Sequence, residues 1–184
     1  MRRFIFYSRT GSTAPFLGSL RENGRLDTVY QCILTSLFDS HAIRRDVEFH
    51  AFLYGAPNPP LHLKIDGGQL HDVRVDEATW TNLLNGIFAG KPHPGMNLSK
   101  EGIEPFSRSI TEKYVLSEKG ENINGIIMND PTFFVGDHVG LPKKFEDLLI
   151  KEGAKKVSIG RNRYLAASTI DIVNYILDQR AYSK

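Results

Sequence analysis

The sequence predicts a single α/β domain over residues 1–184, with a mainly parallel sheet and helices on both faces. Short apolar segments rich in β-branched and aromatic residues alternate with amphipathic helical segments along the whole chain. Several of the apolar segments end in polar turns that contain glycine, and no internal repeat or low-complexity tract interrupts the pattern. Strands that alternate with helices in this way are joined by right-handed crossovers into a parallel sheet.

The first strand is expected at residues 2–8, where aromatic and β-branched residues are frequent. Residues 10–23 contain Gly, Ser, Thr, Pro and Asn and therefore predict a loop. Asp27 can cap a helix that runs to about His41, because the apolar residues of this segment fall on one broad face.

A second strand is expected at residues 47–54, before the stiff turn GAPNPP. The turn Asp66-Gly67-Gly68 is expected to join strands 61–65 and 70–75 into a small hairpin. The other predicted strands cover residues 96–98, 132–135 and 156–159, and one begins at 114–116 before a polar stretch, 117–124. The other predicted helices cover residues 77–89, 103–111, 143–151 and 167–180.

The stretch FFVGDHVGLP, residues 133–142, combines a buried strand end, a polar turn and the start of a helix. Gly136 and Gly140 bracket the turn, and glycine allows a positive φ or a close approach of the backbone to a ligand. Pro142 suits the first turn of the helix that follows. In an open α/β sheet such a turn lies at the carboxyl edge of the strands, where ligands bind.

Three turns of this kind follow late strands: 117–120, 136–140 and 158–163. If their strands are parallel neighbours, the turns converge on one edge and could surround a ligand. The sequence lacks both the G-x-G-x-x-G fingerprint and the G-x-x-x-x-G-K-[ST] phosphate loop, which disfavours an ordinary dinucleotide or triphosphate site.

Composition indicates a soluble globular protein, with 41% hydrophobic residues, 24% charged residues and a net charge of +2. No apolar run is long enough to span a bilayer, and the basic N-terminus is interrupted too early for a signal peptide, so no membrane partner is expected. The single cysteine, Cys32, fits a reducing compartment, and we expect a cytoplasmic protein. Cys32 lies beside the apolar stripe of its helix and has no nearby base.

No metal is expected. The six histidines show neither the H-E-x-x-H nor the H-x-x-E-H spacing of zinc sites. The Gly-Asp-His at 136–138 is similar to one motif of metallophosphoesterases, in which the aspartate bridges two metals. That family also has an Asp-x-His-Gly motif near its start and a Gly-Asn-His motif. Here Asp39-Ser40-His41 is followed by Ala42 instead of glycine, and Gly-Asn-His does not occur.

Arg25 and Asp27 place a cation and a carboxylate where a loop meets a helix. Two interpretations stay open, a helix N-cap beside a solvated arginine and a catalytic pair. Basic residues also gather near the three turns, where an anionic nucleic acid would lie if it were the substrate.

Seven segments in this order resemble the archaeal TrmY family of tRNA pseudouridine N1-methyltransferases and its bacterial relatives, in the SPOUT superfamily. They are FIFYSR (4–9), GRLD (24–27), SHAIRRDV (40–47), LYGAPNPP (53–60), FFVGDHVG (133–140), GAKKVSIG (153–160) and IDIVNYILD (170–178). The resemblance implies a C-terminal trefoil knot, a homodimer and S-adenosylmethionine bound in the knot. It also implies that Arg25 and Asp27 contact the target base. The positions that match cofactor contacts are Leu116, Gly136, Ser158, Ile159, Gly160, Arg161, Asn162, Arg163 and Thr169.

The chain departs from the family pattern before its last helix, where Ser168 and Thr169 replace a histidine and a cysteine. Two functions are therefore carried forward. The first is methylation of ring N1 of pseudouridine in RNA, with tRNA as the expected substrate. The second is an RNA- or ligand-binding protein of the same fold with weak, altered or no methyltransferase activity.

Overall fold

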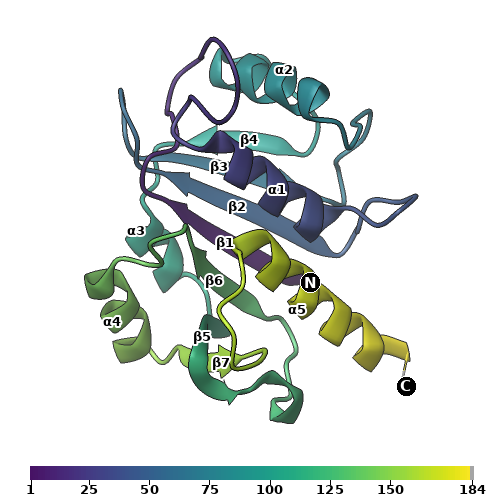
Figure 1. The fold of residues 1–184 in the computed structure, drawn as a ribbon, viewed down its shortest axis with the longest axis vertical. Coiled ribbons are helices and arrows are strands. Elements are labelled where there is room, and N and C mark those ends of the chain that lie inside the picture. The colour runs from purple at the N-terminus through teal and green to yellow at the C-terminus, as the bar shows by residue number, and fades with distance from the viewer. Residues whose placement is uncertain (183–184) are drawn as a thin grey trace.

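The computed structural model describes residues 1–182, which form one seven-stranded sheet with helices on both faces (Figure 1). The strands are β1 (Arg2–Ser8), β2 (Val47–Leu53), β3 (Leu61–Asp66), β4 (Met96–Ser99), β5 (Lys113–Asn122), β6 (Thr132–Gly136) and β7 (Lys155–Ser158). The helices are α1 (Leu26–Leu37), α2 (Glu77–Phe88), α3 (Ile103–Arg108), α4 (Lys143–Lys151) and α5 (Ala166–Tyr182), with a short 3-10 helix, η1 (Ile123–Gly125).

The strand order is β4-β3-β2-β1-β6-β5-β7. The five neighbouring strands β2, β1, β6, β5 and β7 run parallel. Strands β3 and β4 extend the sheet with antiparallel pairs. The prediction of a mainly parallel α/β sheet is therefore confirmed. Because parallel strands end at the same edge, β1, β2, β6 and β7 deliver their carboxyl ends to one side of the molecule.

Two apolar layers cover the two faces of the sheet. The larger layer lies under α1, α2 and α5, and the smaller one lies under α3 and α4. Across the middle of the sheet, the rings of Phe4, Phe133 and Tyr114 stack on neighbouring strands, with centroids 5.6 and 5.5 Å apart. This aromatic row fixes the register of β1, β6 and β5, since each ring pairs directly with the next across the ladder.

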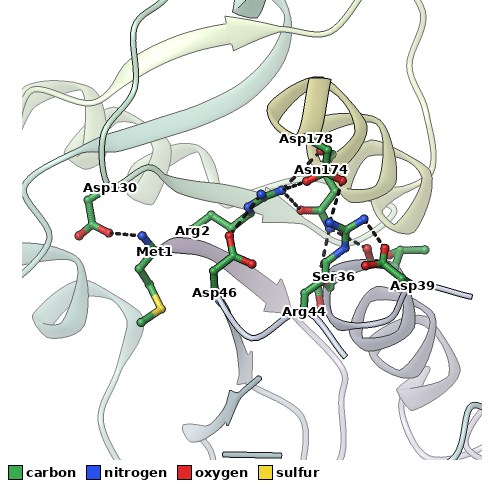
Figure 2. Close-up of polar contacts among 10 residues, drawn as sticks. Met1, Arg2, Ser36, Asp39, Arg44, Asp46, Asp130, Asn174 and Asp178 are labelled. Atoms are coloured by element: carbon green, nitrogen blue, oxygen red, sulfur yellow. Dashed lines mark hydrogen bonds and ion pairs between the residues drawn. The ribbon is translucent and has the colours of Figure 1, made fainter. Parts of the chain in front are cut away.

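Helix α5 packs beside α1, and polar contacts hold its C-terminal half (Figures 1 and 2). Asn174 is 1% exposed and donates to the carbonyl oxygens of Thr35 and Ser36. Asp178 accepts hydrogen bonds from Arg2 at 2.9 Å and from Arg44 at 2.7 Å. These charge-assisted bonds tie the last helix to β1 and to the segment after α1.

Three predictions about residues 27–111 were wrong. Residues 70–75 form no strand, because β4 occupies the edge of β3 where the second strand of the hairpin was expected. Helix α1 ends at Leu37 because Phe38 turns into extended backbone, bridges to Ile43 and packs edge-on against Trp80. Helix α3 stops at Arg108, three residues before its predicted end.

A buried pair of histidines lies on the α3 side of the sheet. His50 Nδ1 and His62 Nε2 are 2.9 Å apart, and the two side chains pack against Phe52 and Phe106. Glu48, Lys64 and Arg3 lie beside His50, and Glu101 lies 3.7 Å from His62. Desolvation lowers the pKa of both histidines, that of His62 to about 3.

This histidine pair predicts loss of stability in mild acid. The folded protein keeps His62 neutral, whereas the unfolded chain takes up a proton near pH 6.5, so stability is full above that pH and falls as the pH decreases. Between pH 7 and pH 5 the free energy of unfolding should fall by about 1–2 kcal/mol on account of His62. Urea unfolding at each pH measures the slope. His62→Phe should make the slope shallower, and the exposed control His71→Phe should not; an equal slope in all three proteins would contradict the assignment.

Candidate functional site

The candidate site lies at the carboxyl edge of the parallel strands, where three loops meet. Strand β6 lies between β1 and β5, and β5 lies between β6 and β7, so the turns after these strands are neighbours. The sequence predicted that residues 117–120, 136–140 and 158–163 converge if their strands are parallel neighbours. The structure has these strands as parallel neighbours.

The loop after β6 is a tight turn. Gly140 N–H donates to the carbonyl oxygen of Asp137, and one carboxylate oxygen of Asp137 accepts from Val139 N–H. A Cβ on Gly136 would lie 2.2 Å from the backbone carbon of Gly140. Glycine is therefore required at 136 by the approach of the chain to itself. Space is open beside Gly140, where a Cβ would meet nothing within 4 Å.

The loop in β5 is an excursion inside the strand. Leu116 and Glu121 both pair with Val157 of β7, so residues 117–120 leave the ladder and then return to it. The polar stretch that was expected to follow this strand therefore lies mostly within it, because β5 continues to Asn122. Glycine is needed at 120, because a Cβ there would lie 2.5 Å from the backbone of Val157.

The loop after β7 is joined to this excursion by an ion pair. Arg163 donates to Glu118 at 2.8 and 3.1 Å. Ser158 braces the start of the same loop, since its hydroxyl bonds both the N–H and the carbonyl oxygen of Gly160. Gly160 is exposed with φ 152°, and the nearest atoms to a Cβ there are 4.0 Å away on Tyr164.

The remaining predicted residues lie around the same edge. Leu116 is partly buried and packs against the larger apolar layer. Ile159 is also partly buried in that layer, while Arg161 and Asn162 are exposed. Thr169 lies in the first turn of α5, is partly buried, and donates its N–H to the carbonyl oxygen of Leu165.

Arg25 and Asp27 reach this edge from the start of α1. The carbonyl oxygen of Thr10, just after β1, lies where a Cβ would stand on Gly24 (1.7 Å) or on Gly55 (2.1 Å). Only glycine at both positions lets the chain before α1 and the chain after β2 pack against the end of β1. Thr10 Oγ1 also donates to the carbonyl oxygen of Gly24.

The two side chains form a bidentate ion pair. Arg25 Nε and Nη2 lie 2.9 and 3.0 Å from the two carboxylate oxygens of Asp27. Partial burial raises the pKa of the Asp27 carboxyl, but hydrogen bonds and charge from Arg25, together with the N–H of Thr28, lower the pKa by more. The carboxylate therefore stays ionised and is 19% exposed, with Arg25 more open at 48%.

The structure corrects the N-cap interpretation of Asp27. Helix α1 begins at Leu26, and its N-cap residue is Arg25, with φ 65° and ψ 36° and no capping hydrogen bond from its side chain. A left-handed conformation costs a non-glycine residue about 1–2 kcal/mol, and strain of this kind clusters at functional sites. Asp27 is the second helical residue, and its carboxylate binds the side chain of Arg25.

Asp137 links the two halves of the edge. Its second carboxylate oxygen accepts a hydrogen bond from Arg9 N–H at 3.0 Å, which joins the loop after β6 to the loop after β1. The sequence marked residue 137 as part of a glycine-bounded turn and of a Gly-Asp-His motif similar to that of metallophosphoesterases, not as a link between loops. Its partner could not be identified before the pairing of β1 with β6 was known. The roles of Thr10 and Gly55 were missed because they depend on the pairing of β1 with β2, and that of Glu118 because it depends on the pairing of β5 with β7.

The other chemistry of the chain lies away from this edge. Cys32 is fully buried and burial raises the pKa of its thiol. A cavity of about 530 Å³ lies on the α3 side, and its lining includes Glu48, His50 and His62. Among residues 1–182, no group of His, Cys, Asp or Glu side chains has an arrangement that could hold a metal ion. Over the same residues, no helix is both long and apolar enough to cross a bilayer.

Known proteins are similar to the chain over almost its whole length. A protein of Methanocella arvoryzae named tRNA (pseudouridine(54)-N(1))-methyltransferase is 34% identical, and the alignment covers 98% of this chain and 100% of the relative. A protein of the same name from Methanocaldococcus jannaschii is 30% identical, with 98% of each chain covered.

The fold is also found among solved structures. The crystal structure of Archaeoglobus fulgidus Nep1 bound to S-adenosylhomocysteine superposes with a TM-score of 0.63 at 18% identity, covering 90% of this chain and 76% of the other. Finally, a family described as "Putative SAM-dependent RNA methyltransferase" matches residues 1–182. The chain belongs to this family of S-adenosylmethionine (SAM)-dependent RNA methyltransferases.

Proposed function

We propose that this protein transfers a methyl group from SAM to ring N1 of pseudouridine in tRNA. Membership of the family supports the SAM dependence, and relatives 30–34% identical over nearly their full length carry the name of that reaction. The observation that carries the proposal is the meeting of three loops and the Arg25–Asp27 pair at one edge of the sheet.

The residues at this edge fit the cofactor. The backbone beside Gly140 and Gly160 faces open space, which leaves room for a ligand against the main chain. Bound SAM supplies an already activated methyl group on its sulfonium. The protein therefore has mainly to align the acceptor, and alignment can be worth roughly 7–11 kcal/mol of the barrier. The residues proposed to hold SAM are Leu116, Gly136, Ser158, Ile159, Gly160, Arg161, Asn162, Arg163 and Thr169.

Asp27 is the proposed proton acceptor. Ring N1 of pseudouridine bears a weakly acidic proton, and an ionised carboxylate beside it can polarise or accept that proton, for a gain of about 10²–10⁴-fold. The lowered pKa of Asp27 keeps the charge available at neutral pH. Arg25 holds that carboxylate in place and offers its remaining N–H groups to a phosphate or to the developing charge on the base.

The alternative function rests on the first turn of α5. Thr169 carries a hydroxyl where the family pattern has a thiol, and Ser168 next to it is exposed. A protein that needs the thiol for turnover would bind SAM and RNA here yet methylate slowly.

The assembly belongs to the same proposal. We infer a single-domain cytoplasmic protein that works without a metal, with its C-terminal segment threaded as a trefoil knot. Arg180 of α5 donates to the carbonyl oxygens of Ile123 and Ile126, so the segment after β5 lies against the last helix, which supports the threading. We also infer a homodimer. Leu165 and Tyr175, 76% and 64% exposed, supply apolar surface for it, and a monomer in light scattering at micromolar concentration would contradict it.

Methyl transfer to a pseudouridine-containing tRNA stem-loop tests the function. We expect one methyl group per stem-loop, measured by mass spectrometry, and none on the same stem-loop with uridine. Addition of EDTA should leave the rate unchanged. Isothermal titration with SAM runs in parallel, and binding without methyl transfer would favour the alternative. Absence of SAM binding would contradict the proposed methyl transfer.

Asp27→Asn separates catalysis from structure. Asparagine keeps the shape but loses the charge, so the rate of methyl transfer should fall about 100-fold or more at saturating SAM. Stability should change by less than about 1 kcal/mol, because partly exposed ion pairs contribute little. The control is Asp147→Asn, which breaks an exposed ion pair with Lys143 on α4 and should keep full activity. Unreduced transfer by Asp27→Asn would show that the carboxylate is only structural.

A further inference from the structure

Leu17 is 91% exposed, and it lies in the loop that leads from β1 into α1. Its neighbours point the other way, since Phe16 is 7% exposed and Leu20 is fully buried in the larger apolar layer. A single exposed leucine is ordinary by itself. What distinguishes Leu17 is that the loop is built to hold it outward.

Hydrogen bonds fix the backbone on both sides of Leu17. The side-chain amide of Asn23 donates to the carbonyl oxygens of Leu17 and Ser19, at 2.8 and 2.7 Å. Phe16 N–H donates to Asn85 on α2, at 2.8 Å. Gly18, which follows Leu17, has a φ of 80° and lets the backbone turn there. The apolar tip is therefore part of a braced loop.

The same loop leads directly to the proposed catalytic pair. Asn23, which binds the Leu17 carbonyl, stands two residues before Arg25, and Arg25 N–H donates to the carbonyl oxygen of Arg21. The side chains of Arg21, Arg25 and Arg9 are exposed around this part of the edge. An exposed apolar tip in a loop that also carries exposed arginines suits an RNA strand, because the cations bind phosphates while the tip faces the bases.

A base in a folded RNA is stacked on its neighbours. Transfer to ring N1 requires that the base leave the stack to reach the carboxylate of Asp27. The gap that it leaves, here called the open step, exposes the flat faces of the two neighbouring bases. Proteins that open such steps insert an apolar side chain, and leucine is among those used.

We propose that Leu17 is the wedge that occupies the RNA stack when the target pseudouridine turns out toward Asp27. The inference rests on the proposed function, because it assumes a base delivered to Asp27. The inference adds Leu17 to the residues proposed to contact RNA, with a role only where the RNA bases are stacked. A short unpaired oligonucleotide has no stack to open, so Leu17 should be dispensable on it.

The test compares Leu17→Ala with Ile127→Ala. Ile127 is 89% exposed and precedes β6, so its side chain is equally open but lies beyond the amino end of that strand. On the pseudouridine stem-loop we expect Leu17→Ala to lower kcat/KM about 10-fold and Ile127→Ala to leave it unchanged. On a five-nucleotide unpaired RNA all proteins should be equal. Leu17→Met should keep the wild-type rate, and titration with SAM should give the same Kd for every variant.

A second readout does not depend on turnover. The stem-loop carries 2-aminopurine beside the target, and its fluorescence rises when the step opens, here in the presence of S-adenosylhomocysteine. Wild type and Ile127→Ala should raise the signal and Leu17→Ala should not. If wild type opens the step without methylating, the proposed function fails while the wedge stands. Equal signals from wild type and Leu17→Ala, no rise with wild type, or a mass change in Leu17→Ala by ultracentrifugation would overturn the wedge.

Discussion

The architecture depends on the close approach of three backbone segments around the carbonyl oxygen of Thr10. Parallel pairing brings the ends of β1, β2 and β6 to one edge, but it does not by itself bring the start of α1 to that edge. The glycines at 24 and 55 do so, because any Cβ there would overlap the Thr10 carbonyl. The same packing leaves Arg25 in a left-handed conformation beside Asp27. Asp137 then ties the loop after β1 to the loop after β6 through the N–H of Arg9. The proposed catalytic pair and the proposed cofactor loops are thus parts of one connected edge.

The polar anchors of helix α5 lie in its C-terminal half. Its 17 residues span about 25 Å, from Ala166 beside the loops to the end that packs near the start of β1. The buried amide of Asn174 and the ion pairs of Asp178 hold the far end to α1, Arg2 and Arg44 (Figure 2). The first turn, with Thr169 proposed to contact SAM, lies outside those polar contacts and is held by apolar packing of the buried Ile170. Substitution of Thr169 can therefore alter the site while the helix stays in place.

The sequence predicted the strands to within a few residues because their apolar runs are short and bounded by turn residues, as at residues 2–8 and 132–135. It failed at residues 70–75, where the edge of β3 is occupied by β4 from beyond α2, a long-range pairing that local pattern does not encode. It placed the loops at 136–140 and 158–163 correctly, but residues 117–120 lie inside β5 as an excursion that depends on the register of β5 against β7. Arg25 and Asp27 entered as candidates through family resemblance, since their spacing alone favoured a helix cap. Their ion pair and the strain at Arg25 are properties of the fold.

We propose that the loops at the carboxyl edge hold SAM. Hydrogen–deuterium exchange with and without S-adenosylhomocysteine tests it without requiring turnover. We expect slower exchange in residues 117–120, 136–140 and 158–163 when the ligand is present. We expect no change around the cavity on the α3 side, in residues 97–101 and 109–111. Protection confined to the cavity, with unchanged exchange in the three loops, would show that SAM does not bind at the carboxyl edge.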